Sequence, residues 1–131
     1  MTPVPVEDID AKWQWIRKGL EQVILRARSD WAPEDVYLAL KQKQAFLFLL
    51  GQVDGFVVVQ RLADQRGPYL FVWAIYGDLV HIKDSIMASL REVAVTTGCR
   101  RLEMRSPRGW ERAGLGWRVK DVIYEADIWK D

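Results

Sequence analysis

One apolar run in the middle of the chain constrains the fold more than any other feature. The run, YLFVWAIY, spans residues 69–76. A strand that is apolar on both faces belongs inside a sheet, with a neighbour on each side. Apolar residues then recur at helical spacing from Leu79 to Thr97, Gly98 is placed to end that helix, and CRRLEMRS is typical of a further strand. A strand, a helix and a strand in this order predict a crossover that joins two parallel strands.

The segments on either side of this crossover predict a mixed sheet. Residues 7–28 have the period of a long amphipathic helix, and residues 29–44, with Pro33 at a first helical turn, indicate a shorter one. The runs AFLFLL and FVVVQRLA predict an antiparallel hairpin. PRGWERAG indicates a turn or one short helix, and GWRVKDVIYEADIWK a closing pair of strands. The expected fold is therefore α/β (α+β): a mixed, mainly antiparallel twisted sheet of about five to seven strands, with helices packed on both faces.

Composition places the chain among ordinary globular domains. Its 131 residues fit one domain, 1–131, and half of them are hydrophobic. The formal charge of +1 gives no argument for nucleic acid or for an anionic membrane. No apolar run approaches the roughly 20 residues that a membrane span requires. The single cysteine, Cys99, excludes an internal disulfide and a multi-cysteine zinc site. We therefore expect a cytoplasmic protein with no metal centre.

The element order and the crossover segment resemble the GNAT (Gcn5-related N-acetyltransferase) family over nearly the whole chain. The resemblance is carried by YLFVWAIYGDLVHIKDSIMASLREVAVTTGCRRLEMRS, where a strand, a helix and a strand have the spacing of the family's acetyl-CoA motif. Downstream, GWERAGLGW is similar to the family's C-terminal segment, with Gly116 and Trp117 where a Gly-Phe pair is usual. The chain also resembles short GNAT-like proteins of tailed phages, which would place it in the host cytoplasm.

The resemblance implies acetyl-CoA as the acyl donor and an amine as the acceptor. The groove between the central strand and RLEMRS would take the pantetheine arm, and backbone N–H groups of that strand would polarise the thioester carbonyl. The residues implied in acetyl-CoA binding are Val72, Trp73, Ala74, Ile75, Gly77, His81 and Lys83. Tyr76 and Tyr124 are the candidate catalytic proton donors, although Tyr76 equally suits a rim residue that closes the core.

Two departures from the family pattern indicate a weakened acetyl-CoA site. The family's pyrophosphate loop follows Arg/Gln-x-x-Gly-x-Gly/Ala, whereas the segment from Gly77 to Lys83 has no second glycine and carries Asp78, whose charge opposes a diphosphate. Arg112 stands where many members have a tyrosine as general acid, and an arginine stays protonated at any working pH. The sequence therefore predicts a degenerate pyrophosphate loop on an N-acyltransferase fold, and it leaves enzymatic activity open.

A basic group supports a competing function, that of a non-catalytic interaction protein. Arginine recognises phosphate with a planar fork, and tryptophan stacks on bases or on the guanidinium itself. Such a surface suits the phosphates of CoA, a protein partner or a nucleic-acid backbone; the alternative is a solvated strand edge that resists aggregation. The group consists of Arg100, Arg101, Arg105, Arg108, Arg112, Arg118 and Lys120, with Trp110 and Trp117 among them.

The remaining candidate residues have structural alternatives. His81, the only histidine, is either a general base or a solvent-facing or capping residue at the start of a helix. Cys99 follows Gly98 at the start of a strand and is interpreted as a packing residue rather than a nucleophile. The seven tryptophans are many for this length, and we expect most of them to be half-buried core residues.

Overall fold

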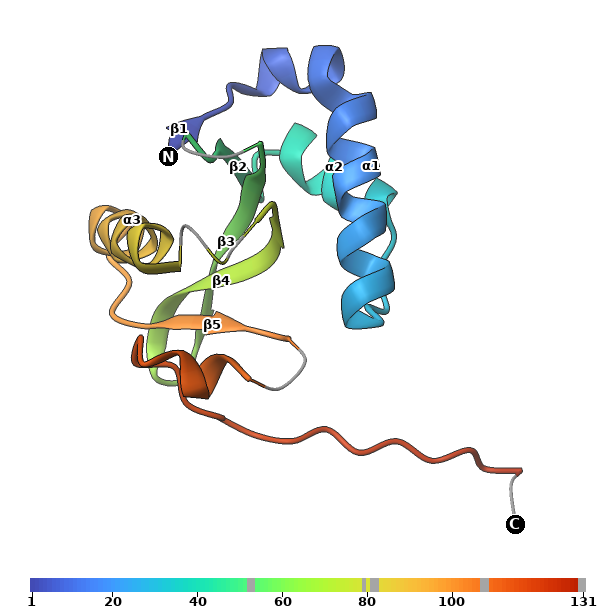
Figure 1. Cartoon of the computed structure of the whole chain (residues 1–131), viewed down its shortest axis with the longest axis vertical. Helices are drawn as coiled ribbons and strands as arrows, with labels where there is room; N and C mark the ends of the chain where they lie inside the picture. Colours follow the sequence, from blue (N-terminus) through green and yellow to red (C-terminus); the bar gives the residue numbers. More distant parts are fainter. Residues whose placement is uncertain (52–53, 79, 81–82, 107–108, 130–131) are drawn as a thin grey trace.

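A mixed sheet of five strands forms the centre of the computed structural model (Figure 1), which describes residues 1–51, 54–78, 80, 83–106 and 109–129. The strands, in their order across the sheet, are β1 (Thr2–Pro3), β2 (Phe46–Leu49), β3 (Phe56–Asp64), β4 (Gly67–Tyr76) and β5 (Leu102–Met104). The helices are η1 (Val6–Asp8), α1 (Ile9–Ala27), α2 (Pro33–Lys41), α3 (Lys83–Thr96) and η2 (Trp110–Ala113).

The strand pairing confirms the predicted crossover. β1, β2, β3 and β4 pair antiparallel in succession, and β4 pairs parallel with β5. The β3–β4 hairpin is closed at Asp64 and Gly67, and an Asp64 carboxylate oxygen accepts the backbone N–H of Arg66 at 2.8 Å. β4 therefore has a neighbour on each side, as its apolar sequence predicts. β1 was not predicted, because two residues are too short to show an alternating pattern.

Alternate side chains of β3 enter two separate cores, one on each face of the sheet. Phe56 and Val58 pack under α1 and α2, whereas Val57 and Val59 pack under α3. Helices therefore cover both faces, as expected (Figure 1). The predicted burial of the α3 stripe is confirmed at two positions, since the buried residues of that core are Leu50, Val57, Val59, Leu70, Val72, Ile86, Leu90, Ala94 and Cys99. The third position, Ile82, lies outside the described residues.

Local chemistry sets the helix ends. Pro33 opens α2, and the Asp35 carboxylate accepts the backbone N–H of Ala32 at 2.8 Å. Gly98 has a φ of +78° after α3, which lets the Cys99 N–H reach the carbonyl of Ala94 at 2.7 Å. α3 is described from Lys83, so the predicted helix start at Leu79 falls outside the described residues.

The predicted closing pair of strands is wrong for the described residues. From residue 114 to residue 129 the described chain contains no strand, and residues 119–129, here called the extended segment, are all exposed. Figure 1 shows the extended segment leaving the body of the molecule. Its β-branched and aromatic residues suit a strand, but a strand forms only where a neighbouring edge bonds its backbone groups, and no described residue pairs with the segment in this way.

The tryptophans follow the expectation drawn from composition. Six of the seven are half-buried and Trp129 is exposed. Trp13, Trp15, Trp31 and Trp73 pack against the core under α1 and α2. No helix in the described part of the chain combines the length and the hydropathy needed to cross a membrane.

Candidate functional site

β4 extends beyond its pairing with β5. The two strands pair only where Leu70 to Val72 face Leu102 to Met104, whereas β4 continues to Tyr76. On the β5 side, residues 73–76 therefore have no partner strand among the described residues. In a strand, backbone groups point alternately to the two neighbours, so part of the N–H and C=O groups of residues 73–76 face this opening. An extended ligand with amide groups can bond there as another strand would.

A β-bulge lies where the opening begins. Val58 pairs with Ala74 but Val59 pairs with Val72, so Trp73 is the extra residue. A bulge bends its strand and increases the local twist, and this bulge directly follows Val72, the last residue of β4 that pairs with β5. Val72 and Ala74 are 2% and 3% exposed as whole residues, so their side chains are buried in the two cores. The backbone role that the sequence resemblance implies for them stays a prediction.

Three further predicted residues have side chains on the two faces of β4. Trp73 packs edge-on against Trp31 under α1 and α2, with ring centroids 5.7 Å apart. Ile75 packs against the α3 core on the other face. Tyr76 is half-buried under α1, where its ring lies 5.3 Å from that of Phe56. Tyr76 thus serves the packing at the rim of the core, and its role as a proton donor stays a prediction.

Two glycines fix the position of Tyr76. A Cβ at Gly19, in the middle of α1, would lie 2.5 Å from Cε2 of Phe56 and 2.9 Å from Cδ2 of Tyr76. A Cβ at Gly55 would overlap the carbonyl oxygen of Tyr76. A larger residue at Gly19 must therefore displace the two rings, and one at Gly55 must displace the backbone at Tyr76. Sequence analysis missed both glycines, although a glycine inside an amphipathic helix costs stability and signals a close contact.

Tyr124 lies far from this arrangement. It is 89% exposed in the extended segment, and the described structure shows no contact between it and Tyr76. The two candidate proton donors are therefore not brought together within one chain.

The turn after β4 is the predicted pyrophosphate loop. Gly77 has a φ of +138°, a backbone conformation that favours glycine. The Asp78 carboxylate accepts the backbone N–H of Val80 at 3.1 Å, and the Val80 side chain is 75% exposed. Lys83 is exposed at the start of α3, whereas His81 lies outside the described residues. The N–H of Val80 is thus bonded to a carboxylate, and the degenerate pyrophosphate loop stays a prediction.

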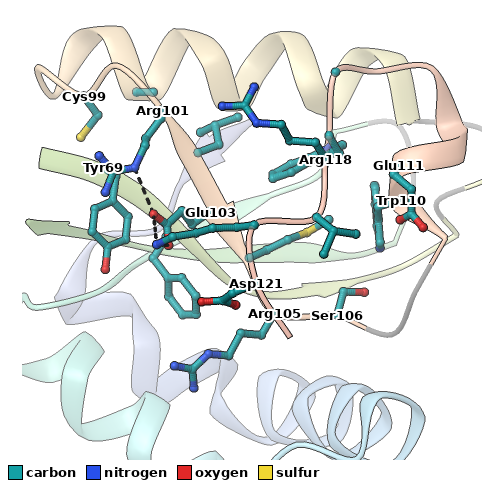
Figure 2. A pocket seen from close by; sticks show the side chains of 18 of the residues that line it. Tyr69, Cys99, Arg101, Glu103, Arg105, Ser106, Trp110, Glu111, Arg118 and Asp121 are labelled. Atoms are coloured by element: carbon teal, nitrogen blue, oxygen red, sulfur yellow. Dashed lines mark hydrogen bonds and ion pairs between the residues drawn. The ribbon is translucent and has the colours of Figure 1, made fainter. Parts of the chain in front are cut away.

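A second feature, an open hollow of about 1370 Å³, lies along β5. α3, β5 and the chain from Gly116 to Ile123 surround it (Figure 2). Its lining includes Met104, Trp110 and Trp117, and the rings of the two tryptophans are 6.2 Å apart. None of the described residues between 72 and 83 lines it. The hollow is therefore separate from the opening beside residues 73–76.

Ion pairs occupy part of the predicted basic group. Arg101 pairs with Asp64 and, at 3.0 Å, with Glu103, and Lys120 reaches Glu103 at 3.0 Å (Figure 2). The guanidinium of Arg101 also lies 4.6 Å from the centre of the Tyr69 ring. Arg101 and Lys120 thus have structural partners, while Arg100, Arg105, Arg112 and Arg118 are exposed and Arg108 lies outside the described residues.

These contacts shift the pKa values of both acids. The hydrogen bond from Arg101 lowers the pKa of Asp64. Burial acts to raise the pKa of Glu103, but hydrogen bonds from Lys120 and Arg101 outweigh it and the pKa is lowered. Both carboxylates are therefore held ionised. Cys99 is buried nearby, 4% exposed, and Thr97 Oγ1 lies 3.5 Å from its sulfur, in agreement with a packing role.

Sequence analysis also missed a polar cluster between α1 and α2. The Tyr37 hydroxyl donates to Asp10 at 2.6 Å, and Lys41 pairs with the same carboxylate at 2.9 Å. The hydrogen bond from Tyr37 lowers the pKa of Asp10, and the same bond raises the pKa of Tyr37. Residues 27 and 31 positions apart in the chain form these bonds, so no local pattern announces them. Among the described residues, no group of three His, Cys, Asp or Glu side chains is placed to hold a metal ion.

No protein-family model matches the sequence, and a comparison with curated proteins also finds no match. Solved structures do match. The aminoglycoside acetyltransferase meta-AAC0020, from an uncultured soil metagenomic sample, superposes with a TM-score of 0.67 at 14% identity, over 98% of this chain and 94% of that one. Ribosomal-protein-alanine N-acetyltransferase from Brucella melitensis biovar Abortus 2308 gives 0.57 at 16% identity, over 95% and 97%.

An integron cassette protein, HFX_CASS3, from the mobile metagenome of Cole Harbour Salt Marsh gives a TM-score of 0.62 at 10% identity, over 99% of this chain and 90% of that one. All three likenesses span almost the full length of both chains. At identities this low they establish a shared fold, the GNAT-like fold, and the chemistry has to be argued from the site.

Proposed function

We propose that this protein binds an acyl-CoA in the opening between β4 and β5 and transfers the acyl group to an amine. The observation that carries the proposal is the stretch of β4, residues 73–76, that continues past the end of its pairing with β5. Full-length likeness to two structures named as acetyltransferases supports the same reaction class. The proposal does not depend on particular side chains, because backbone N–H and C=O groups of residues 73–76 would bind the ligand.

The pantetheine arm of the substrate carries two amides, which match the exposed backbone groups of an unpaired strand edge. A backbone N–H within residues 73–75 would donate to the thioester carbonyl oxygen and stabilise the charge that develops there. The amine attacks the carbonyl carbon, the C–N bond forms and the C–S bond breaks. The amine proton passes to water, and the departing sulfur takes a proton from a donor, for which Tyr76 is our candidate.

The turn after β4 contributes less to binding than a phosphate cradle would. Asp78 is bonded to the N–H of Val80 and places a negative charge where the diphosphate would lie. We therefore propose that affinity comes mainly from the pantetheine arm. Acetyl-pantetheine should then bind within about threefold of acetyl-CoA, since the nucleotide adds little. A loss of a hundredfold or more without the nucleotide would show that the turn binds the diphosphate.

Calorimetric titration with acetyl-CoA, together with thiol release in the presence of a panel of amines, tests the proposal. Tyr76→Phe removes the hydroxyl and keeps the ring, and it should slow transfer by about 10²-fold or more while binding is unchanged. Tyr124→Phe is the matched control and should leave transfer unchanged, because that side chain is exposed and away from the opening. Absence of acetyl-CoA binding at millimolar concentration would refute the proposal.

A second function, that of a non-catalytic interaction protein, is favoured by the same turn and by the arginine at position 112. The bonded carboxylate of Asp78 and the exposed Arg112, at the position where the family resemblance expects a tyrosine, both suit a protein that keeps the fold without the reaction. In that case the surface around Trp110 and the exposed arginines would bind a protein or a nucleic acid. Fluorescence anisotropy with single-stranded DNA, in low and high salt, tests whether the partner is a nucleic acid. A phage origin stays a prediction of the sequence.

A further inference from the structure

The hollow along β5 concentrates the positive charge of this chain. Its lining contains seven arginine and lysine residues and three acids, for a net charge of +4. The whole chain has a formal charge of +1, so the residues outside the hollow carry a net charge of −3 between them. A concave surface lined by one sign of charge focuses the electrostatic field and attracts ligands of the opposite sign. The hollow therefore favours an anionic ligand.

Four of these bases have no partner within the described structure. Arg101 and Lys120 are held in ion pairs, and Arg91 donates to the carbonyl of Leu115 at 2.9 Å. Figure 2 shows Arg118 toward α3 and Arg105 away from it. Four separate guanidinium groups suit a ligand with several anionic groups rather than one. The four exposed arginines, whose side chains make no hydrogen bond or ion pair with a described residue, are Arg66, Arg100, Arg105 and Arg118.

Two aromatic side chains reach the hollow from the sheet. Tyr69 and Phe71 alternate along β4 with two residues of the α3 core, so they lie on the opposite face of the strand. Both are half-buried, and neither belongs to the core under α1 and α2 or to the core under α3. The guanidinium of Arg101, 4.6 Å from the centre of the Tyr69 ring, shows that a planar group packs on this surface.

Two tryptophans line the hollow from the chain that follows β5. The rings of Trp110 and Trp117 are inclined at 69° to each other, and such an edge-to-face contact leaves at least one face of each ring uncovered by its neighbour. Flat rings beside cations are the features by which proteins hold single-stranded nucleic acid, because bases stack on the rings while phosphates pair with the cations. An acidic peptide would use the cations alone.

We propose that this hollow binds a single strand of DNA or RNA, with phosphates paired to the four exposed arginines and bases stacked on the aromatic rings beside them. The proposal rests on the second function above and names the partner of its interaction surface. The hollow, of about 1370 Å³, exceeds the roughly 300–1,000 Å³ of a pocket for a drug-sized ligand, which suits several units of a polymer. A duplex keeps its bases stacked on one another and cannot offer them to the rings without unstacking.

Fluorescence anisotropy with labelled single strands of about 12 nucleotides tests the proposal. The parent should bind oligothymidylate or oligouridylate, and the ratio of the two affinities distinguishes DNA from RNA. The logarithm of the affinity should fall with the logarithm of the salt concentration with a slope of about −3, since each of four phosphate contacts contributes about −0.7. A strand of equal length without bases should bind about fivefold more weakly or worse, with the same slope, because it has nothing to stack.

A charge-matched pair of variants locates the phosphate contacts. Arg100→Gln with Arg118→Gln removes two of them and should reduce the slope to about −1.5. Lys18→Gln with Arg26→Gln is the control, because it removes the same charge from exposed residues of α1 outside the hollow, and its slope should stay near that of the parent. An Arg100/Arg118 variant with the same slope as the control would overturn the proposal.

The parent protein alone also decides the question. Absence of binding to both oligonucleotides at low salt, or equal affinity for the strand without bases, would overturn the proposal. Equal affinity for a polyglutamate peptide of the same length would overturn it too, while the second function would stand with an acidic protein as the partner. Titration with acetyl-CoA is a separate measurement, so the proposed acyl transfer is judged independently of these results.

Discussion

Replacement of Gly19 by alanine should destabilise the protein by about 1–2 kcal/mol, although alanine is the better helix former. The new Cβ would lie 2.5 and 2.8 Å from two ring carbons of Phe56 and 2.9 Å from the ring of Tyr76. Non-bonded carbons prefer about 3.5–4.0 Å, so both rings must retreat by about 1 Å. Phe56 is 0% exposed and has no solvent to retreat into.

The magnitude follows from two opposing effects. Alanine in place of glycine inside a helix contributes about 1 kcal/mol of stability. Overpacking of a filled core costs about 1–3 kcal/mol, and the upper part of that range applies because two rings are displaced rather than one. The difference is a net loss of about 1–2 kcal/mol. Since the Tyr76 ring moves with it, acyl transfer should fall in the same variant.

Urea unfolding followed by tryptophan fluorescence measures this difference, provided that the slope with denaturant stays equal in parent and variant. Gly51→Ala is the control, because a Cβ there has nothing within 4 Å. The control should be neutral or up to about 1 kcal/mol more stable. If Gly19→Ala is also as stable as the parent, the rings yield without cost and the reasoning about Tyr76 is wrong.

Three further predictions concern the α3 core, the turn and the ion pairs. Leu90→Ala should cost about 2–5 kcal/mol in urea unfolding, and a loss under about 0.5 kcal/mol would contradict its place in the core. Asp78→Gly with Val80→Gly frees a backbone N–H and removes a charge, so CoA should bind about 1–2 kcal/mol more tightly in calorimetry at modest salt; weaker binding would mean that the turn already works as it stands. The two acids beside Arg101 have lowered pKa values in the folded state, so their contribution to stability is present above about pH 4 and is lost as the pH falls. The parent should therefore lose more stability than Arg101→Met between about pH 6 and pH 3, and equal losses would refute this.

The elements that could be predicted from the sequence are those whose pattern of apolar residues follows directly from which faces are buried. β3 begins with the unbroken apolar run from Phe56 to Val59 because each of its faces enters a core, and α3 keeps a 3.6-residue period because only one of its faces does. The crossover followed from the apolar run of β4, the helical period of α3 and the strand-like sequence after Gly98. The parallel pairing of β4 with β5 then needed no long-range information beyond the handedness and length of the connection.

The extended segment shows why periodicity alone does not decide secondary structure. Its alternation was interpreted as a closing pair of strands, yet it contains no strand, because backbone hydrogen bonds depend on a neighbour that the sequence does not specify. A period describes which faces a strand would have if it formed. It carries no information about which edge, or which chain, supplies the partner.

The sequence resemblance indicated where to look for a candidate site, and it did not indicate the site's detailed geometry. The family resemblance placed acyl-CoA beside Val72 to Ile75, and the structure has an opening along residues 73–76. The bulge at Trp73 depends on the register between two strands, and the fit of Gly19 against Tyr76 depends on how α1 lies across the sheet. Both are properties of three-dimensional neighbours, so no local pattern contains them.

The difference between the two connections of β4 has a consequence for the order of folding. β3 and β4 are joined by a short turn, so their pairing closes a very small loop. β5 can pair with β4 only after a loop of about 30 residues has closed, and α3 lies within that loop. Local contacts form sooner because they lose less chain entropy. β5 is therefore expected to join the sheet after β3 and β4 have paired, so the β5 wall of the candidate site forms later than the β4 wall.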